Sequence, residues 1–347
     1  MKTALGLTAL ALTLAATPLF AQRFHRLESA VPLEAAAPDW DYLSFDPARG
    51  NLFIAARPDG MIVYDVNVKK VVRTLEDTRG ANASIQVPEF DRIYTVNLDG
   101  TSTVFQLSTL KKLDKIKLGE DADAAFYDPV TKEVAFMRGD SNEITYVDGA
   151  TGKVAARLAM PSKKLEASAA DGQGNMFTAS RDRNSVFKVN MKDHKVVAEY
   201  PADCEEANGM AIDRVGKRLF VGCRGKSPVL AVMDTETGRV VAKLEIGRGN
   251  DGVIYDPETR KLYTSSGVDG NLVIFDQVDA DTYKLAEATT TRPYARTMAL
   301  DPKTKKLYLV TAEGTVDPSK KVNRAPAPFY PNRYFPDTFT LLTYSPK

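Results

Sequence analysis

The stretch ANGMAIDRVGKRLFVGC, residues 207–223, contains two short runs of alternating apolar residues on either side of a polar turn. The turn opens at Asp213, and the second run carries Leu219 and Phe220. Alternation with a period of two is typical of half-buried β-strands, and Asp and Gly favour the tight turn between them. The stretch therefore predicts a β-hairpin whose first strand begins near Asn208.

The same hairpin pattern recurs along the chain every 41 to 45 residues. A third strand follows in most units, and a fourth often opens with a basic residue and a valine pair, as in HKVVAEY and GRVVAKL. The turn position is occupied successively by Asp46, Val87, Asp128, Asp171, Asp213, Asp256 and Asp301. Seven such units predict an all-β fold, a seven-bladed β-propeller with four-stranded antiparallel blades.

The seventh unit contains RTMALD, KLYLVT and TFTLLTY and is one strand short. We expect an N-terminal strand from FHRLESA, residues 24–30, to join this last blade, because it would close the ring and leave no open sheet edge. A single propeller domain is thus expected over residues 22–347. Residues 312–338 form an insertion between the second and third strands of the last blade.

Residues 1–21 predict a cleavable signal peptide. A single Lys precedes an apolar stretch from Ala4 to Ala16, and the small residue Ala21 precedes the expected cleavage point. No other segment is long and apolar enough to span a membrane. We therefore expect an exported protein, periplasmic or secreted. A formal net charge of +1 argues against nucleic acid as a partner.

The chain has two cysteines, Cys204 and Cys223. Both are expected at the same end of one blade, so in an oxidising compartment we predict that they form a disulfide bond. The alternative is a pair of buried free thiols.

The sequence resembles a known family over essentially the whole mature chain, and the resemblance is clearest in two segments. RIYTVNLDGTSTVFQL (residues 92–107) and KLYTSSGVDGNLVIFD (residues 261–276) resemble the strand–turn–strand signature of the YncE-like, YVTN-repeat propellers of bacterial periplasms. The resemblance implies the seven-bladed fold. It implies little about function beyond a binding scaffold.

A second, local resemblance concerns ANGMAID and NDGVIYD, which are similar to segments of calcium-dependent lactonases of the gluconolactonase and regucalcin type. This resemblance implies a Ca²⁺ ion held by Asp41, Asn208 and Asp251. The sequence departs from that family in two ways, since the family has six blades and a Glu where this chain has Asp41.

The residue five positions before each turn defines what we call the ring positions. They are Asp41, Asn82, Asp123, Glu166, Asn208, Asp251 and Arg296. The innermost strand of each blade should begin at one mouth of the central channel, so we expect these seven side chains to converge there. Close carboxylate pairs repel by on the order of a few kcal/mol at an effective dielectric constant near 20. Arg296, protonation, water or a bound cation must relieve that repulsion.

Oxygen ligands suit Ca²⁺, so Ca²⁺ is the one candidate cofactor, with Asn82, Asp123 and Glu166 as further candidate ligands. The chain has only two histidines, His25 and His194, and neither occupies a ring position. This argues against zinc, copper, haem and a His-based triad. The alternative is that the ring residues stabilise their own turns or line a wet channel without any ligand.

A basic shell is expected around the ring. Arg57, Arg138, Arg181 and Arg224 lie at or just beyond the ends of second strands, and with Arg296 they are candidate ligand-binding residues. The alternative is that they pair with the ring carboxylates or with solvated neighbours. The insertion is basic and aromatic, and its Tyr330 and Tyr334 are further candidates. We expect it to cover the channel mouth, or else to pack beside Trp40 on the seventh and first blades.

Two functions follow from these residues. The first is a non-catalytic propeller that binds a small ligand, a cation or a periplasmic protein at its channel mouth. The second is a calcium-dependent lactonase, in which Asp251 or Asp123 would deprotonate water.

Overall fold

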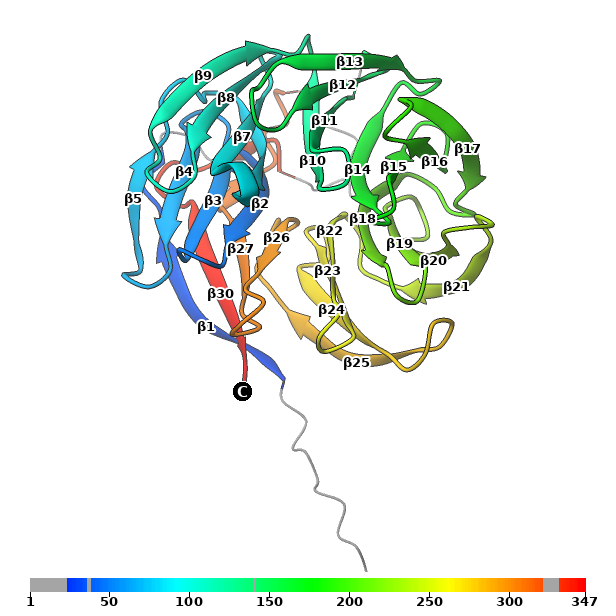
Figure 1. The fold of residues 1–347 in the computed structure, drawn as a ribbon. Helices are drawn as coiled ribbons and strands as arrows, with labels where there is room; N and C mark the ends of the chain where they lie inside the picture. Colours follow the sequence, from blue (N-terminus) through cyan, green and yellow to red (C-terminus); the bar gives the residue numbers. More distant parts are fainter. Residues whose placement is uncertain (1–23, 36–38, 140, 321–330) are drawn as a thin grey trace, which may run out of the picture.

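The computed structural model describes residues 24–35, 39–139, 141–320 and 331–347. Their strands form seven four-stranded antiparallel sheets arranged as blades around a central axis (Figure 1). The predicted seven-bladed propeller is therefore confirmed. The predicted signal peptide lies outside the described residues.

The first four blades follow one another along the chain, and in each the first strand is innermost. Blade 1 has β2 (Trp40–Asp46), β3 (Asn51–Ala56), β4 (Gly60–Asp65) and β5 (Lys70–Thr74). Blade 2 has β6 (Ala81–Val87), β7 (Arg92–Asn97), β8 (Thr101–Gln106) and β9 (Lys112–Lys117). Blade 3 has β10 (Ala122–Asp128), β11 (Glu133–Arg138), β12 (Glu143–Asp148) and β13 (Val154–Ala159). Blade 4 has β14 (Leu165–Ala170), β15 (Asn175–Ser180), β16 (Ser185–Asn190) and β17 (Lys195–Pro201).

Blades 5 and 6 repeat this order, and blade 7 combines strands from both ends of the chain. Blade 5 has β18 (Ala207–Asp213), β19 (Arg218–Cys223), β20 (Val229–Asp234) and β21 (Val240–Glu245). Blade 6 has β22 (Asn250–Asp256), β23 (Lys261–Ser266), β24 (Asn271–Gln277) and β25 (Tyr283–Thr290). Blade 7 has β26 (Met298–Leu300), β27 (Leu307–Thr311), β30 (Thr340–Pro346) and β1 (His25–Pro32).

The repeated Asp residues make the first turn of their blades. In each of six blades a carboxylate oxygen of the turn Asp accepts a hydrogen bond from the backbone N–H two residues later, for example 3.0 Å from Asp213 Oδ1 to Val215 N. Blade 2 has Val87 at this position and turns through the 3-10 helix η1 (Pro88–Phe90) instead. A side chain that mimics a backbone turn thus explains why Asp recurs at this spacing.

The core consists of seven hydrophobic clusters, and each lies between two neighbouring blades. Tyr94 of blade 2 faces Phe136 of blade 3 at 6.3 Å between ring centroids, and Trp40 of blade 1 faces Phe339 beside blade 7 at 5.4 Å. Burying one such side chain is worth about 1.5–3 kcal/mol. Because seven blades share seven interfaces, each sheet is covered on both faces only when the ring is closed.

Ring closure depends on β1, which pairs antiparallel with β30 from His25 to Pro32 (Figure 1). This confirms the predicted N-terminal strand in the last blade. His25 also contacts blade 6, because its backbone N–H and its Nδ1 lie 2.7 and 3.1 Å from the carboxylate of Glu287, and its ring packs edge-on against Tyr263. The N-terminal strand is therefore held by two blades.

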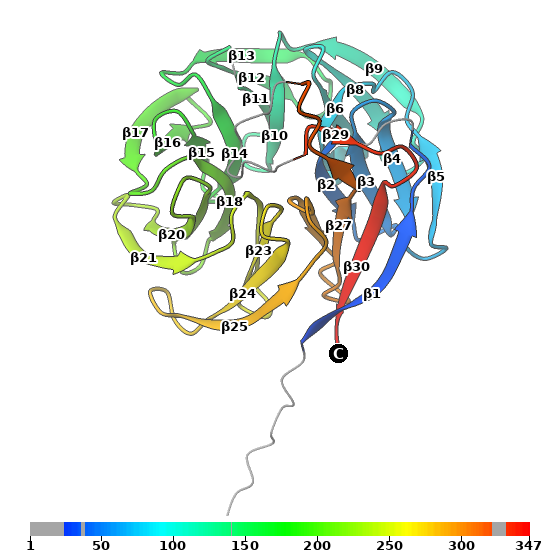
Figure 2. The ribbon, with the colours of Figure 1, turned by 180° about the vertical axis from the view of Figure 1, so that it is seen from behind.

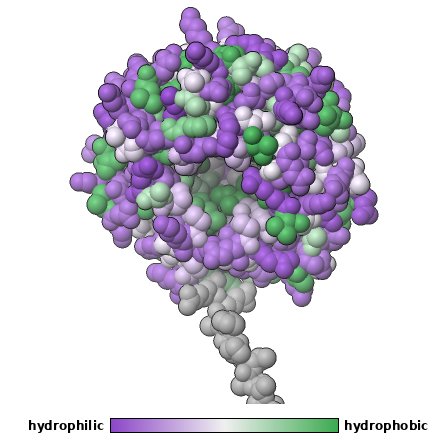
Figure 3. All heavy atoms as spheres, viewed as in Figure 1, coloured by the Kyte–Doolittle hydropathy of each residue, from purple (hydrophilic) through white to green (hydrophobic). Residues whose placement is uncertain are grey.

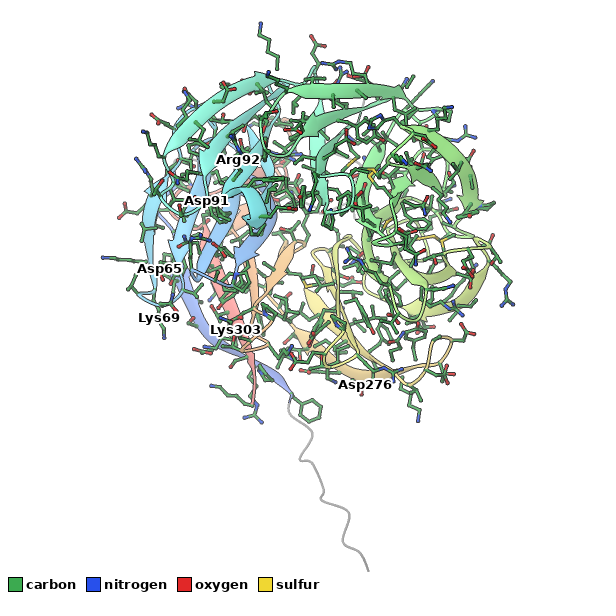
Figure 4. The ribbon with its side chains drawn as sticks, in the orientation of Figure 1. Asp65, Lys69, Asp91, Arg92, Asp276 and Lys303 are labelled. Carbon is green, nitrogen blue, oxygen red and sulfur yellow. A yellow bond between two sulfur atoms is a disulfide. The ribbon has the colours of Figure 1, made fainter. Side chains whose placement is uncertain are left out.

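The two faces of the ring differ. Figure 3 shows a hollow at the centre of one face with hydrophobic residues inside it. This agrees with a cavity of about 200 Å³ along the channel lined by small and apolar residues such as Leu43, Ala83, Ala124 and Met210. Charged turn residues of this face, including Asp65, Lys69 and Lys303, lie over the blades rather than in the opening (Figure 4).

The described part of the chain has one helix, the three-residue η1. No helix in this part is long and apolar enough to cross a membrane.

We predict that a chain beginning at Leu33, which lacks β1, melts at a markedly lower temperature and self-associates. Its β30 edge would be unpaired, because β1 is the outermost strand of blade 7. Thermal unfolding and size-exclusion chromatography measure both effects. Arg26→Ala is the control, because Arg26 is exposed and pairs with Ser345 through its backbone. Equal stability of the truncated and full chains would contradict the closure role.

Candidate functional site

The ring positions lie at the second residue of each inner strand in blades 1 to 6. In all six blades the pairing of the inner strand with its neighbour shifts register at this point, for example between Ala122 and Ala124 in blade 3. A β-bulge leaves the extra residue out of the ladder and re-aims its side chain. The bulge explains how a strand buried on both faces presents Asp123 and its counterparts at the channel mouth.

A cavity of about 700 Å³ opens at this mouth. Five of the seven ring positions line it, namely Asp41, Asp123, Glu166, Asp251 and Arg296. Asn82 and Asn208 are buried beside these residues and bond to them rather than lining the cavity. Three of the predicted shell arginines also line it: Arg57, Arg181 and Arg224.

The first half of the mouth is a chain of ionic and amide contacts across blades 1 to 4. Arg57 donates to the Asp41 carboxylate, and its Nε donates to Asn82 Oδ1 at 2.8 Å. The Asn82 amide then donates to the Asp123 backbone carbonyl at 3.0 Å. Lys164 Nζ lies 3.1 Å from Asp123 Oδ2. Each carboxylate here thus has a cationic partner from its own or the next blade.

The second half centres on the buried carboxylate of Asp251. Its Oδ1 accepts from the Asn208 amide at 2.9 Å and from Arg224, while its Oδ2 lies 2.9 Å from Arg296 Nε. Arg296 also donates to the Trp40 carbonyl and lies over the Trp40 ring at 5.3 Å. Blades 5, 6, 7 and 1 are therefore linked at the mouth by one carboxylate and one guanidinium.

The NG and DG segments have a packing role at this point. A Cβ atom at Gly209 would lie 2.7 Å from the backbone oxygen of Asp251, and one at Gly252 would lie 2.5 Å from Ser265 Oγ. Both distances are too short for a real side chain. Gly209 therefore lets the inner strands of blades 5 and 6 approach closely, and Gly252 leaves room for Ser265 on the next strand of its own blade. Both are reasons for these motifs that require no metal.

Glu166 is the ring acid whose ionised form is least stabilised by its surroundings. Burial raises the pKa of Glu166 to about 8, and the effect is opposed by Arg181 and Lys164 and reinforced by Asp123 and Asp251. The Arg181 guanidinium lies 3.1 Å away, yet the near oxygen, Oε1, accepts no hydrogen bond. Glu166 therefore carries a proton for much of the time at neutral pH.

Burial at the mouth also raises the pKa of two further groups, Asp41 and Tyr42. Burial raises the pKa of Asp41 to about 6, against the opposing charges of Arg57 and Arg296. Burial, followed by the Glu166 and Asp41 charges, holds the pKa of Tyr42 well above its ordinary value, so its hydroxyl stays neutral. Tyr42 lines both the mouth cavity and the channel cavity, so it lies between them.

The insertion lines the cavity and also packs against blade 1. Its two legs pair as β28 (Gly314–Thr315) and β29 (Arg333–Tyr334), on the face of the ring seen in Figure 2. Tyr334 packs against Trp40 with 5.1 Å between ring centroids. Lys320 and residues 331–334 line the cavity. The described parts of the insertion therefore line the mouth cavity and pack beside Trp40, and its covering of the mouth stays a prediction.

Some predicted residues lie elsewhere. Arg138 does not line the cavity, because it pairs with Glu143, the residue directly opposite it on the next strand of its own blade. Tyr330 lies outside the described residues.

Sequence reasoning also missed several lining residues. They are Asp39, Tyr42, Lys164, Lys320, Pro331, Asn332 and Arg333. Lys164 precedes a ring position by two residues and Tyr42 follows one directly, so a wider window around the ring would have included both.

The predicted disulfide is confirmed. Cys204 and Cys223 are bonded, with 6.0 Å between their Cα atoms. Cys223 pairs with Ala207 in the ladder and directly precedes Arg224, so the bond ties the rim of the mouth to blade 5.

The ring fits a resident metal ion poorly. Asp41, Asp123 and Asp251 each contact an arginine or lysine, and Ca²⁺ would have to displace those cations. In the portion of the chain that the structure describes, no three His, Cys, Asp or Glu side chains are grouped so that they could hold a metal. The calcium site inferred from the lactonase resemblance remains an untested prediction.

Comparison with known proteins yields one named family. No family model matches the chain. Over 190 residues it is 24% identical to the uncharacterized protein YncE of Salmonella typhi and equally to that of Salmonella typhimurium, a match covering 52% of this chain and 53% of each relative. The chain thus matches about half the length of these curated relatives. Together with the seven-bladed fold, this similarity supports a YncE-like propeller family, as the sequence motifs predicted.

Solved structures show the fold alone. A chain of the Kuenenia stuttgartiensis hydrazine synthase superposes with a TM-score of 0.69 at 16% identity, covering 80% of this chain and 94% of that chain. A chain of the mitotic checkpoint complex superposes with a TM-score of 0.71 at 14% identity, covering 89% and 96%.

We predict that stability falls as the pH rises from about 5 to about 9, and that Glu166→Gln reduces this fall. The pKa of Glu166 is about 8 in the folded protein against an ordinary value of 4.5, so folding favours its protonated form. The resulting stability is full below about pH 4.5 and is lost as the pH rises through 8. The difference between the two proteins should reach on the order of a few kcal/mol.

Denaturant unfolding at several pH values measures this slope. Glu199→Gln is the matched control, because hydrogen bonding to Arg183 lowers the pKa of Glu199 and completes its titration at lower pH. The hypothesis fails if Glu166→Gln has the same slope as the wild type between pH 6 and 9.

We also predict that the Cys204→Ser, Cys223→Ser double variant loses about 3 kcal/mol of unfolding free energy, because the bond closes a loop of 19 residues. Denaturant unfolding of the reduced wild-type protein should show the same loss of unfolding free energy. A loss well below 1 kcal/mol would show that the bond does not constrain the rim.

Proposed function

We propose that the protein is an exported, non-catalytic β-propeller that binds a small polar ligand in the cavity at its channel mouth. The observation that carries this proposal is the convergence of ionic side chains from every blade except blade 2 on one cavity of about 700 Å³. That volume is in the range typical of small-molecule sites, and such sites are few per protein.

The lining favours binding over catalysis. None of the described residues that line the cavity is a Ser, Thr, Cys or His, so no Ser, Thr or Cys nucleophile is paired with a His base among them. The ring carboxylates Asp123 and Asp251, the candidate bases, are both held by cations. Their contacts suit a rigid and preorganised binding surface.

Export is supported by three observations. The bond between Cys204 and Cys223 is typical of an oxidising compartment. The similarity to YncE and the apolar N-terminal sequence agree with a periplasmic location.

A thermal-shift panel tests the binding function. The mature chain is mixed separately with citrate, phosphate, trehalose, glycine betaine, spermidine and CaCl₂. We expect at least one small molecule to raise the melting temperature, because a ligand at 100 times its dissociation constant adds about 2.7 kcal/mol of stability. A rise with CaCl₂ that Asp251→Ala abolishes would instead favour the lactonase alternative, which a panel of lactones would then test.

Two tryptophan variants locate the binding. Asp39→Trp and Lys320→Trp both place a Trp side chain at the cavity rim, but they change the charge in opposite directions. If both variants lose the ligand-induced rise in melting temperature, the cause is blockage of the cavity and not the change in charge. Asp193→Trp and Lys192→Trp make the same changes in the exposed turn between β16 and β17, at the other end of the blades, and should retain the shift. Retention of the shift in both rim variants would refute the mouth as the site.

A further inference from the structure

The mouth cavity has an excess of positive charge despite its acidic ring, and this bears on the ligand that the proposed function requires. Among the described residues, seven lysine and arginine side chains line it against five carboxylates. Protonation of Glu166, whose pKa is about 8, removes one of those negative charges at neutral pH. The cavity as a whole is therefore cationic, although the ring positions alone predict a mainly acidic mouth.

Blades 4 and 5 and the insertion contribute most of these cations. Arg181 has a protonated Glu166 as its nearest carboxyl group. Arg224 contacts Asp251, and its buried Nε makes no hydrogen bond to a described residue, although the Glu206 carboxylate lies 3.8 Å from it. Buried donors are normally satisfied, so Arg224 Nε can accommodate a ligand oxygen placed closer than that of Glu206.

The insertion adds two cations to the same cavity. Arg333 is exposed, and its nearest carboxylate, Asp317, is 3.9 Å away. Lys320 lines the same cavity from the other leg of the insertion. Arginine forks bind carboxylate and phosphate groups through two parallel hydrogen bonds.

We infer that the ligand of the mouth cavity is a small oxyanion, a compound with carboxylate or phosphate groups, held by Arg181, Arg224 and Arg333. This inference rests on the proposed binding function and specifies its ligand class. The lining offers few apolar surfaces apart from Tyr42, Pro331 and Tyr334, so the rest of the ligand is small and hydrophilic. The neutral Tyr42 hydroxyl at the floor can donate one further hydrogen bond.

Calorimetric titration of the mature chain at pH 7 and constant ionic strength tests this ligand class. Citrate serves as the carboxylate probe, inorganic phosphate as the phosphate probe, and trehalose and spermidine as neutral and cationic references. We expect one-to-one binding of citrate or phosphate, and the tighter of the two identifies the group that the site prefers. We expect no binding of either reference.

Two variants locate the anion. Arg181→Gln should weaken binding about tenfold or more, because it removes a charge-assisted hydrogen bond. Arg183→Gln is the matched control two residues away, where the arginine pairs with Glu199 at the exposed surface, and it should change binding less than about twofold.

The pH dependence provides a second readout that a merely structural role of Arg181 would not change. Citrate affinity should fall between pH 7 and 9 as Glu166 ionises beside Arg181, and Glu166→Gln should not show this fall.

The outcomes separate the two proposals. Equal weakening by Arg181→Gln and Arg183→Gln would overturn the anion site. Binding of trehalose or spermidine but of neither anion would overturn the ligand class and leave the binding function standing. If no compound in either panel binds, both proposals fail.

Discussion

Each blade of this protein can cover the two faces of its sheet only against its two neighbours, and every other feature depends on that constraint. Seven hydrophobic clusters lie in seven interfaces, so the ring stabilises itself only when it is closed. The N-terminal strand completes blade 7 and reaches blade 6 through His25 and Glu287. Closure in turn fixes the seven inner strands around one axis and thereby creates the mouth.

The same constraint explains the chemistry of the mouth. Inner strands buried on both faces have apolar positions along most of their length, and the bulge at each strand start releases one residue from the ladder. Acidic and amide residues at these bulges repel unless cations reach them, and Arg57, Lys164, Arg224 and Arg296 do so. With the cations of the insertion added, the described lining cations outnumber the described carboxylates, so an acidic ring gives a cationic cavity.

The fold could be predicted from sequence because its signals are local and repeated. The turn Asp bonds its own backbone, so it recurs in register with the blades and reveals their number. The missing seventh outer strand and the cysteine pair were predictable from the same repeat. The cavity was harder to predict, because its partners are far apart in sequence. Lys164 pairs with Asp123 across 41 residues, and Arg138 is drawn away from the mouth by Glu143 opposite it.

The central claim is that the mouth binds an oxyanion because cations exceed carboxylates there. A crystal structure of the mature protein grown in citrate at pH 7 tests it most directly. The account predicts citrate density in the mouth cavity, with carboxylate oxygens within hydrogen-bond distance of Arg181. A cation coordinated by Asp41, Asn208 and Asp251, or citrate bound only outside the cavity, would contradict it.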